Sequence, residues 1–194
     1  MTTGKHGFYR VLALVTLLGL GITQSARANL ITNGGFETGN FSGWTVFGTD
    51  NDVVGVQPFT SPHSGNFQAL FASGDNSISQ NVTTTPGSSY VITFWLAANV
   101  RQGGSPSVSV NWGGSSIFSQ SLTSPSSYTE YTFDVNALSP ATQLQFQFSS
   151  IFGNVFYLDD ISVTRAGVPD GGSTVSLLGL ALLGMAVLRR KLRC

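Results

Sequence analysis

The chain has 194 residues and no net charge, but residues 29–167 hold only two cations, Arg101 and Arg165, against eight carboxylates, a net charge of −6. Such an acidic segment excludes nucleic acid as a partner, because phosphate binding needs a basic patch. The single cysteine, Cys194, excludes a disulfide framework, so stability must come from a packed core or a bound metal.

The first residues have the features of an export signal. Lys5 and Arg10 precede an apolar stretch over 11–22, which is followed by Ala-Arg-Ala at 26–28. This order predicts a signal peptide over residues 1–28, cut by signal peptidase between Ala28 and Asn29, and therefore export to the periplasm.

Residues 29–167 form one segment of ordinary domain size that lacks helical periodicity. In Thr142–Ser149 three apolar residues alternate with three glutamines, which indicates a strand with one face in a core. Clusters of Gly, Pro, Ser and Asn separate further short runs of this kind, which predicts an all-β, antiparallel β-sandwich. The other strands are expected at 67–72, 77–82, 90–98, 107–112, 128–135 and 155–164.

Both ends of this domain carry a family resemblance. The opening, Asn29-Leu-Ile-Thr-Asn-Gly-Gly-Phe-Glu-Thr-Gly-Asn-Phe-Ser-Gly-Trp44, resembles that of carbohydrate-binding modules of the family 4 and 9 type, and the closing segment 156–163 resembles their last strand. Those modules are jelly rolls of the galactose-binding-like class. The resemblance implies this fold for the domain but does not name a ligand, since one scaffold hosts many functions.

Three carboxylates are candidate metal ligands: Glu37 in the opening loop and Asp159 and Asp160 in the last strand. The resemblance implies a structural calcium held by an early Glu, a late Asp and backbone carbonyls, and calcium prefers six to eight such oxygens. Alternation with Ile161 and Val163 places Asp159 on the inner side, where a carboxylate needs a partner. Hydrogen bonds to loop amides are the alternative to calcium.

Sugar binding needs an aromatic plate beside amides and carboxylates. Alternation over 90–96 points Trp95 outward, and the outward Gln143, Gln145 and Gln147 are expected to line the same concave sheet. Trp112 and the loop around Phe47 are further candidates for the plate. The alternative is that Trp112 fills the core and the glutamine row is a solvated sheet face.

Catalysis has little support in the sequence. His63 is the only histidine in 29–167, which also lacks lysine and cysteine, and no Gly-x-Ser-x-Gly element occurs. We therefore expect a domain that is not an enzyme.

The tail, residues 168–194, has three parts: Val168-Pro169-Asp170-Gly171, an apolar run over 175–188 and a basic cluster over 189–193. As a helix the run would be roughly 21 Å long, short of a bilayer core of about 30 Å. The order resembles the PEP-CTERM sorting tails of Gram-negative bacteria, in the Val-Pro-Asp-Ser-Gly subtype. That resemblance implies cleavage near the motif by an exosortase, with the tail in the inner membrane and the basic cluster cytoplasmic until then. An ordinary C-terminal anchor is the alternative.

Together these features predict an exported protein, at the cell surface or secreted, whose domain binds a polysaccharide, such as the exopolysaccharide associated with sorting tails of this type. The competing hypothesis is a structural or adhesive matrix protein without a specific glycan ligand.

Overall fold

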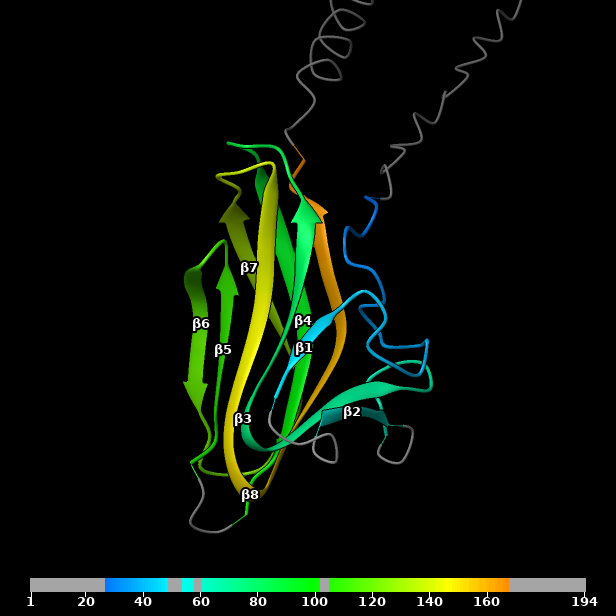
Figure 1. Ribbon diagram of the computed structural model, residues 1–194, viewed down its shortest axis with the longest axis vertical. Helices are drawn as coiled ribbons and strands as arrows, with labels where there is room; N and C mark the ends of the chain where they lie inside the picture. Colours follow the sequence, from blue (N-terminus) through cyan, green and yellow to red (C-terminus); the bar gives the residue numbers. More distant parts are fainter. Residues whose placement is uncertain (1–26, 49–53, 58–60, 102–104, 168–194) are drawn as a thin grey trace, which may run out of the picture.

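The computed structural model describes residues 27–48, 54–57, 61–101 and 105–167 (Figure 1), so residues 1–26 of the expected signal peptide and the sorting tail from Val168 lie outside the described residues. The described part is all strand, turn and loop, and it holds no apolar helix of membrane-spanning length. Eight strands are present: β1 (Thr45–Phe47), β2 (Val54–Gln57), β3 (Gln68–Thr83), β4 (Ser89–Asn99), β5 (Ser107–Trp112), β6 (Ser115–Ser121), β7 (Ser126–Asn136) and β8 (Ala141–Arg165).

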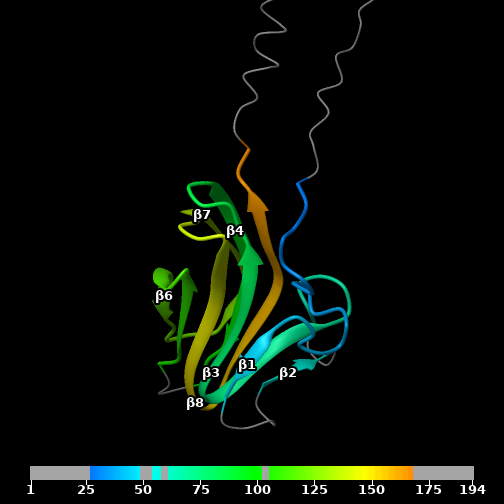
Figure 2. The ribbon, with the colours of Figure 1, turned by 45° about the horizontal axis from the view of Figure 1, so that its top comes forward.

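The strands form two antiparallel layers, and the two long strands β3 and β8 run through both (Figures 1 and 2). In the first layer, the N-terminal half of β8 lies between β5 and the C-terminal half of β3, with β6 and β1 at the two edges. In the second layer, the C-terminal half of β8 lies between β4 and the start of β3, with β7 and β2 at the edges. The predicted antiparallel β-sandwich is therefore confirmed.

Glycines allow the two long strands to pass from one layer to the other. The pairing of β3 with β8 shifts register between Ala72 and Gly74, and Gly74 has φ of 76°. Gly153, with φ of 94°, lies at the matching position of β8. Residues other than glycine rarely adopt positive φ angles of this size, so each glycine allows its strand to bend without ending it. This bend is why the four segments predicted at 67–72, 77–82, 142–149 and 155–164 are two strands.

The inner faces of the two layers bury a core rich in aromatic rings. Phe94 of β4 meets Phe146 of β8 edge-on with ring centroids 5.1 Å apart, and Phe71 stacks on Phe148 at 4.1 Å. All four rings are at most 2% exposed. Burying each such side chain contributes roughly 1.5–3 kcal/mol, so the core can stabilise the domain without disulfides.

The opening segment runs beside the last strand. Leu30 N–H donates to the Val163 carbonyl and Ile161 N–H donates to the Gly34 carbonyl. Further along, Phe36 is fully buried in the core. Gly34 lies so close to β8 that a Cβ there would stand 2.0 Å from the Ile161 oxygen. The contact requires glycine at this position.

Candidate functional site

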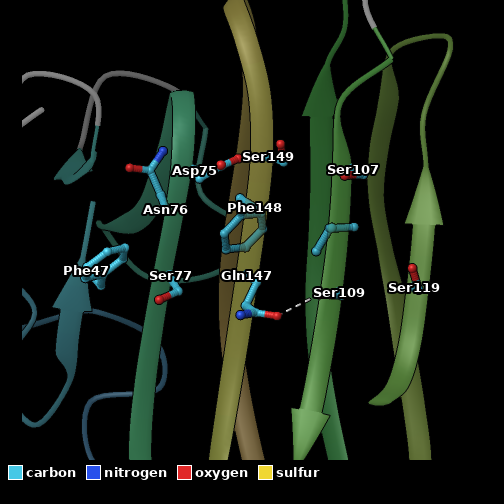
Figure 3. Close-up of a pocket in the computed structure, with 11 residues that line it drawn as sticks. Phe47, Asp75, Asn76, Ser77, Ser107, Ser109, Ser119, Gln147, Phe148 and Ser149 are labelled. Carbon is cyan, nitrogen blue, oxygen red and sulfur yellow. Dashed lines mark hydrogen bonds between the residues drawn. The ribbon is translucent and has the colours of Figure 1, made fainter. Parts of the chain in front are cut away.

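The outer face of the first layer carries rows of polar side chains that cross the strands. One row joins five strands in register: Phe47 (β1), Ser77 (β3), Gln147 (β8), Ser109 (β5) and Ser119 (β6). Residues opposite one another on antiparallel strands project to the same side, so the five side chains share one face. Figure 3 shows them lying from Phe47 at one side to Ser119 at the other.

A second row lies next to the first. Asp75, Ser149, Ser107 and Ser121 face one another across β3, β8, β5 and β6. Between them the two rows border a groove of about 380 Å³, which we call the polar groove. Its lining residues are Phe47, Asp75, Asn76, Ser77, Ser107, Val108, Ser109, Ser119, Gln147, Phe148 and Ser149.

Neighbouring side chains hold the central glutamine of the groove in place. Gln147 Oε1 accepts hydrogen bonds from Ser109 Oγ at 3.2 Å and from Asn111 Nδ2 at 3.0 Å (Figure 3 marks the first). At the β1 edge the ring of Phe47 is 70% exposed. The groove thus combines an oriented amide, several hydroxyls, one carboxylate and an accessible aromatic ring.

The three predicted metal ligands lie elsewhere, at a loop over the outer face of the second layer. We call residues 61–67 the strap loop, because carboxylates hold its backbone. Glu37 accepts hydrogen bonds from the amides of Asn66 and Phe67 at 2.9–3.1 Å. Asp159 Oδ2 accepts from the amides of His63 and Ser64 at 2.9 and 3.2 Å.

Asp160 binds side chains of the same loop. Its carboxylate meets His63 Nδ1 at 2.6 Å and accepts a hydrogen bond from Ser64 Oγ at 2.7 Å. The His63 ring in turn stacks on Trp95, with centroids 3.7 Å apart and planes 14° apart, while the Tyr128 ring meets His63 edge-on. The strap loop therefore covers one face of Trp95.

Asp159 does not point into the sandwich core as predicted. It lies opposite Trp95 on the outer side of β8, beneath the strap loop, and is fully buried there. The alternation is interrupted at Asp160, whose φ is 48°, and the register with β4 shifts between Thr93 and Trp95. This extra residue in β8 places Ile161 and Val163 inside while Asp159 faces out.

Burial also governs the ionisation of this region. Loss of water raises the pKa of Asp159 from 3.8 to about 6, and the nearby charge of Asp160 adds to the rise, while its three amide donors act in the opposite direction. Tyr128, whose hydroxyl donates to Gln68 Oε1, also has a raised pKa, mainly through burial and next through the charge of Asp159.

The carboxylates at the strap loop fit hydrogen-bond capping better than calcium. Both oxygens of Glu37 and both of Asp159 accept backbone N–H groups, which point their hydrogens where a cation would need to be. Within the described ranges no three His, Cys, Asp or Glu side chains are grouped so that they could hold a metal. The chelation experiment in the Discussion distinguishes a calcium ion at Glu37, Asp159 and Asp160 from capping by the loop amides.

The predicted sugar-binding residues do not lie on one surface. Gln143, Gln145 and Gln147 are on the outer face of the first layer, whereas Trp95 is on the outer face of the second. The expectation of one shared sheet is wrong because β8 changes layers between the glutamines and the segment beside Trp95. Trp95 does point outward, as predicted, and the structure shows that it is half-buried.

Trp112 is a core residue. It is 5% exposed, packs near Tyr90 and donates from its indole nitrogen to the Asn136 carbonyl at 2.9 Å. It borders a smaller hollow at one end of the sandwich but presents no open ring face. This is the core-filling alternative, and it follows from its place at an inward position of β5.

Phe47 is the aromatic residue of the polar groove, and the sequence named it only as part of a loop. β1 is three residues long and every one of them is exposed, so no alternation signals a strand there. The serines and Asp75 were missed because their juxtaposition depends on strand register, which a single sequence does not display.

Comparison with solved structures supports the fold. A family 61 carbohydrate-binding module, TmCBM61, solved with β-1,4-galactotriose, has a TM-score of 0.55 at 22% identity, over 72% of this chain and 99% of that one. The K3 adhesin domain of Lys-gingipain from Porphyromonas gingivalis has a TM-score of 0.55 at 16% identity, over 71% and 99%. The CBM22-1 xylan-binding domain of Xyn10C from Paenibacillus barcinonensis has a TM-score of 0.50 at 14% identity, over 74% and 97%.

Sequence comparison identifies both the domain and the tail. No curated protein matches the sequence. The VPDSG-CTERM motif matches residues 167–192, which confirms the predicted type of tail. The family described as a protein of unknown function, DUF642, matches residues 40–157, more than half of the chain. The chain therefore belongs to the DUF642 family and ends in a VPDSG-CTERM motif.

Proposed function

We propose that this protein is an exported, non-catalytic carbohydrate-binding module whose ligand lies in the polar groove. One observation carries the proposal: the row from Phe47 to Ser119 that crosses five strands with an exposed aromatic ring at one end. A pyranose has an apolar face and a rim of hydroxyls. The ring of Phe47 suits the first, and the serines with Gln147 suit the second.

The groove has the chemistry for binding but not for glycoside hydrolysis. Hydrolysis of a glycosidic bond ordinarily needs two carboxyl groups, roughly 5–10 Å apart, on either side of the bond. Among the described residues that line the groove, Asp75 is the one carboxylate. His63 is on the other layer of the sandwich, beside Trp95. Binding without turnover is therefore the activity that these residues support.

The binding test uses the full-length protein in detergent and follows its retardation in native gels that contain neutral polysaccharides such as galactan and xylan. Phe47→Ala should weaken retardation at least roughly tenfold, because losing an apolar contact of about 1.5 kcal/mol or more changes the dissociation constant by that factor. Leu138→Ala is the matched control, since Leu138 is 89% exposed and lies outside the polar groove. Wild-type protein that no polysaccharide retards would refute the proposal.

Trp95 remains a second candidate plate, on the opposite layer. Its ring is partly covered by His63, so a sugar could reach that face only after the strap loop moves. Trp95→Ala in the same gels distinguishes the two sites. We expect retardation to persist in Trp95→Ala and to fall in Phe47→Ala, and the reverse result would move the site to the second layer.

The protein reaches its destination through the two terminal segments. Signal peptidase removes residues 1–28, and residues 29–167 form the exported domain. Residues 175–188 hold the tail in the inner membrane until an exosortase cuts near Val168-Pro169-Asp170-Gly171. The VPDSG-CTERM match supports this route. The domain then stays at the cell surface or is secreted, among the exopolysaccharide that we propose as its ligand.

A structural or adhesive role without a glycan is the competing proposal. The similarity in fold to an adhesin domain of Lys-gingipain favours it. Cells lacking the protein would then aggregate differently, although the purified protein bound no polysaccharide. Retardation by any glycan that Phe47→Ala abolishes would decide against this role as the sole one.

A further inference from the structure

The charges in and around the polar groove carry information about the class of glycan, given the proposed function. Among the described residues that line the groove, Asp75 is the single charged side chain. It is exposed and lies opposite Ser149, at the edge of the second row of side chains. Figure 3 shows its carboxylate beside Ser149.

The two arginines of residues 29–167 have contacts elsewhere in the domain. Arg165 donates to Ser88 Oγ at 2.8 Å, in the turn between β3 and β4, and Arg101 lies against Gly153 where β8 bends. Neither lines the polar groove. Among the described lining residues the groove therefore offers no cationic partner to a carboxylate or sulfate on a ligand, and the segment 29–167 as a whole carries −6.

An acidic ligand would be repelled both by Asp75 and by the net negative charge of the domain. A uronate placed in the groove would bring a second carboxylate near Asp75, at a surface where like charges raise the free energy of the complex and where salt screens only part of the effect. The net negative charge also lowers the local concentration of anionic polymers. A neutral sugar meets neither cost, and its hydroxyls can donate to Asp75 in charge-assisted hydrogen bonds.

The length of the row limits the size of the ligand. Five adjacent strands spaced about 4.8 Å apart extend over roughly 19 Å, which is room for about three pyranose rings in a line across the strands. We infer that the polar groove selects a neutral oligosaccharide segment of about this length, laid across the strands, and that Asp75 is the residue that rejects acidic glycans. This inference rests on the proposed function of the groove.

Charge reversal at Asp75 tests the inference. Full-length wild type, Asp75→Asn and Asp75→Lys are compared on a neutral polymer, galactan, and on polygalacturonate, whose sugars carry carboxylates. Wild type should bind galactan at least tenfold more tightly than polygalacturonate. Asp75→Lys should raise affinity for polygalacturonate about tenfold, and about 0.5 M salt should remove most of that gain.

A matched control separates a local effect from a change in net charge. Asp134→Lys makes the same charge change on β7, at an exposed position outside the polar groove. It should leave the preference between the two polymers unchanged. Equal gains in Asp134→Lys and Asp75→Lys would overturn the role of Asp75.

The remaining outcomes distinguish the two proposals. Wild type that binds polygalacturonate as tightly as galactan, with both lost in Phe47→Ala, refutes the neutral class but keeps the groove as a glycan site. If neither polymer is bound by wild type or by any variant, the proposed function fails and this inference fails with it. Circular dichroism of each variant checks that lost binding is not lost folding.

Discussion

The pH dependence of stability at Asp159 distinguishes capping by the strap-loop amides from binding of a cation, because the two predict changes of opposite sign. Its carboxyl group is fully buried, and its pKa is raised from 3.8 to about 6. The protonated form is therefore favoured in the folded state. Stability from this group is present in full below pH 3.8 and is lost as the pH rises through about 6, because the folded protein then binds more protons than the unfolded chain.

The size of this loss in the free energy of unfolding follows from the difference between the two pKa values. At about 1.4 kcal/mol per pH unit, the loss between pH 4 and pH 7 amounts to about 3 kcal/mol. Asp159→Asn removes the titration and leaves one acceptor oxygen for three amide donors, so the variant loses roughly 1–3 kcal/mol as an offset to which the pH-dependent change in wild type is added. The free energy of unfolding of wild type minus that of Asp159→Asn should therefore fall by up to about 3 kcal/mol from pH 4 to pH 7.

Urea unfolding of both full-length proteins, followed by tryptophan fluorescence at pH 4, 5, 6 and 7 with a chelator present, measures this difference. Asp134→Asn, at an exposed position of β7, is the control and should show no such trend. A difference between wild type and Asp159→Asn that does not change with pH would refute the reasoning. A difference that widens as the pH rises when calcium is added would mean that the ionised carboxylate is stabilised, as a bound cation requires.

Three further predictions test the fold, the metal and the tail. Gly34→Ala should lower the free energy of unfolding by about 3 kcal/mol or more, because its Cβ would meet the Ile161 carbonyl oxygen at 2.0 Å. Gly114→Ala, with φ of 83° but open space around it, should cost only about 1 kcal/mol, and equal losses in urea unfolding would contradict the steric argument. A chelator should leave the calorimetric melting midpoint unchanged, since loop amides already bind the carboxylates, whereas a fall of several degrees would establish calcium. Mass spectrometry of the exported protein should show a C-terminus near Val168, and recovery of an intact Cys194 would count against processing.

Regular alternation made most of the fold predictable. Ser107–Trp112 was predicted with the observed bounds, and the strands at 90–98 and 128–135 are one or two residues longer than expected at each end. β1, β2 and β6 were not predicted. β6 reads Ser-Ser-Ile-Phe-Ser-Gln-Ser, in which most residues have low strand propensity, and it is a strand because β5 pairs with it.

The candidate site was less predictable because strand register and layer membership are tertiary properties. The sequence identified Gln147 as outward-facing, and the structure confirms this. It could not show that Ser77 and Ser109 flank Gln147, since each comes from a strand about 40 to 70 residues away in the chain. It also assigned Trp95 to the same sheet as the glutamines, because the bend of β8 has no signal beyond one glycine.

The same bend explains why the two outer faces differ in chemistry. Since β8 is continuous through both layers, its N-terminal half presents glutamines to one side of the molecule and its C-terminal half presents Asp159 and Asp160 to the other. The acidic pair is satisfied by the strap loop, which closes over Trp95 and leaves little open surface there. No described residue covers the glutamine face in this way, and its exposed amides and hydroxyls are open to a ligand. The difference in chemistry between the two faces thus follows from where one strand crosses the sandwich, and the Phe47→Ala and Trp95→Ala variants test whether binding follows that difference.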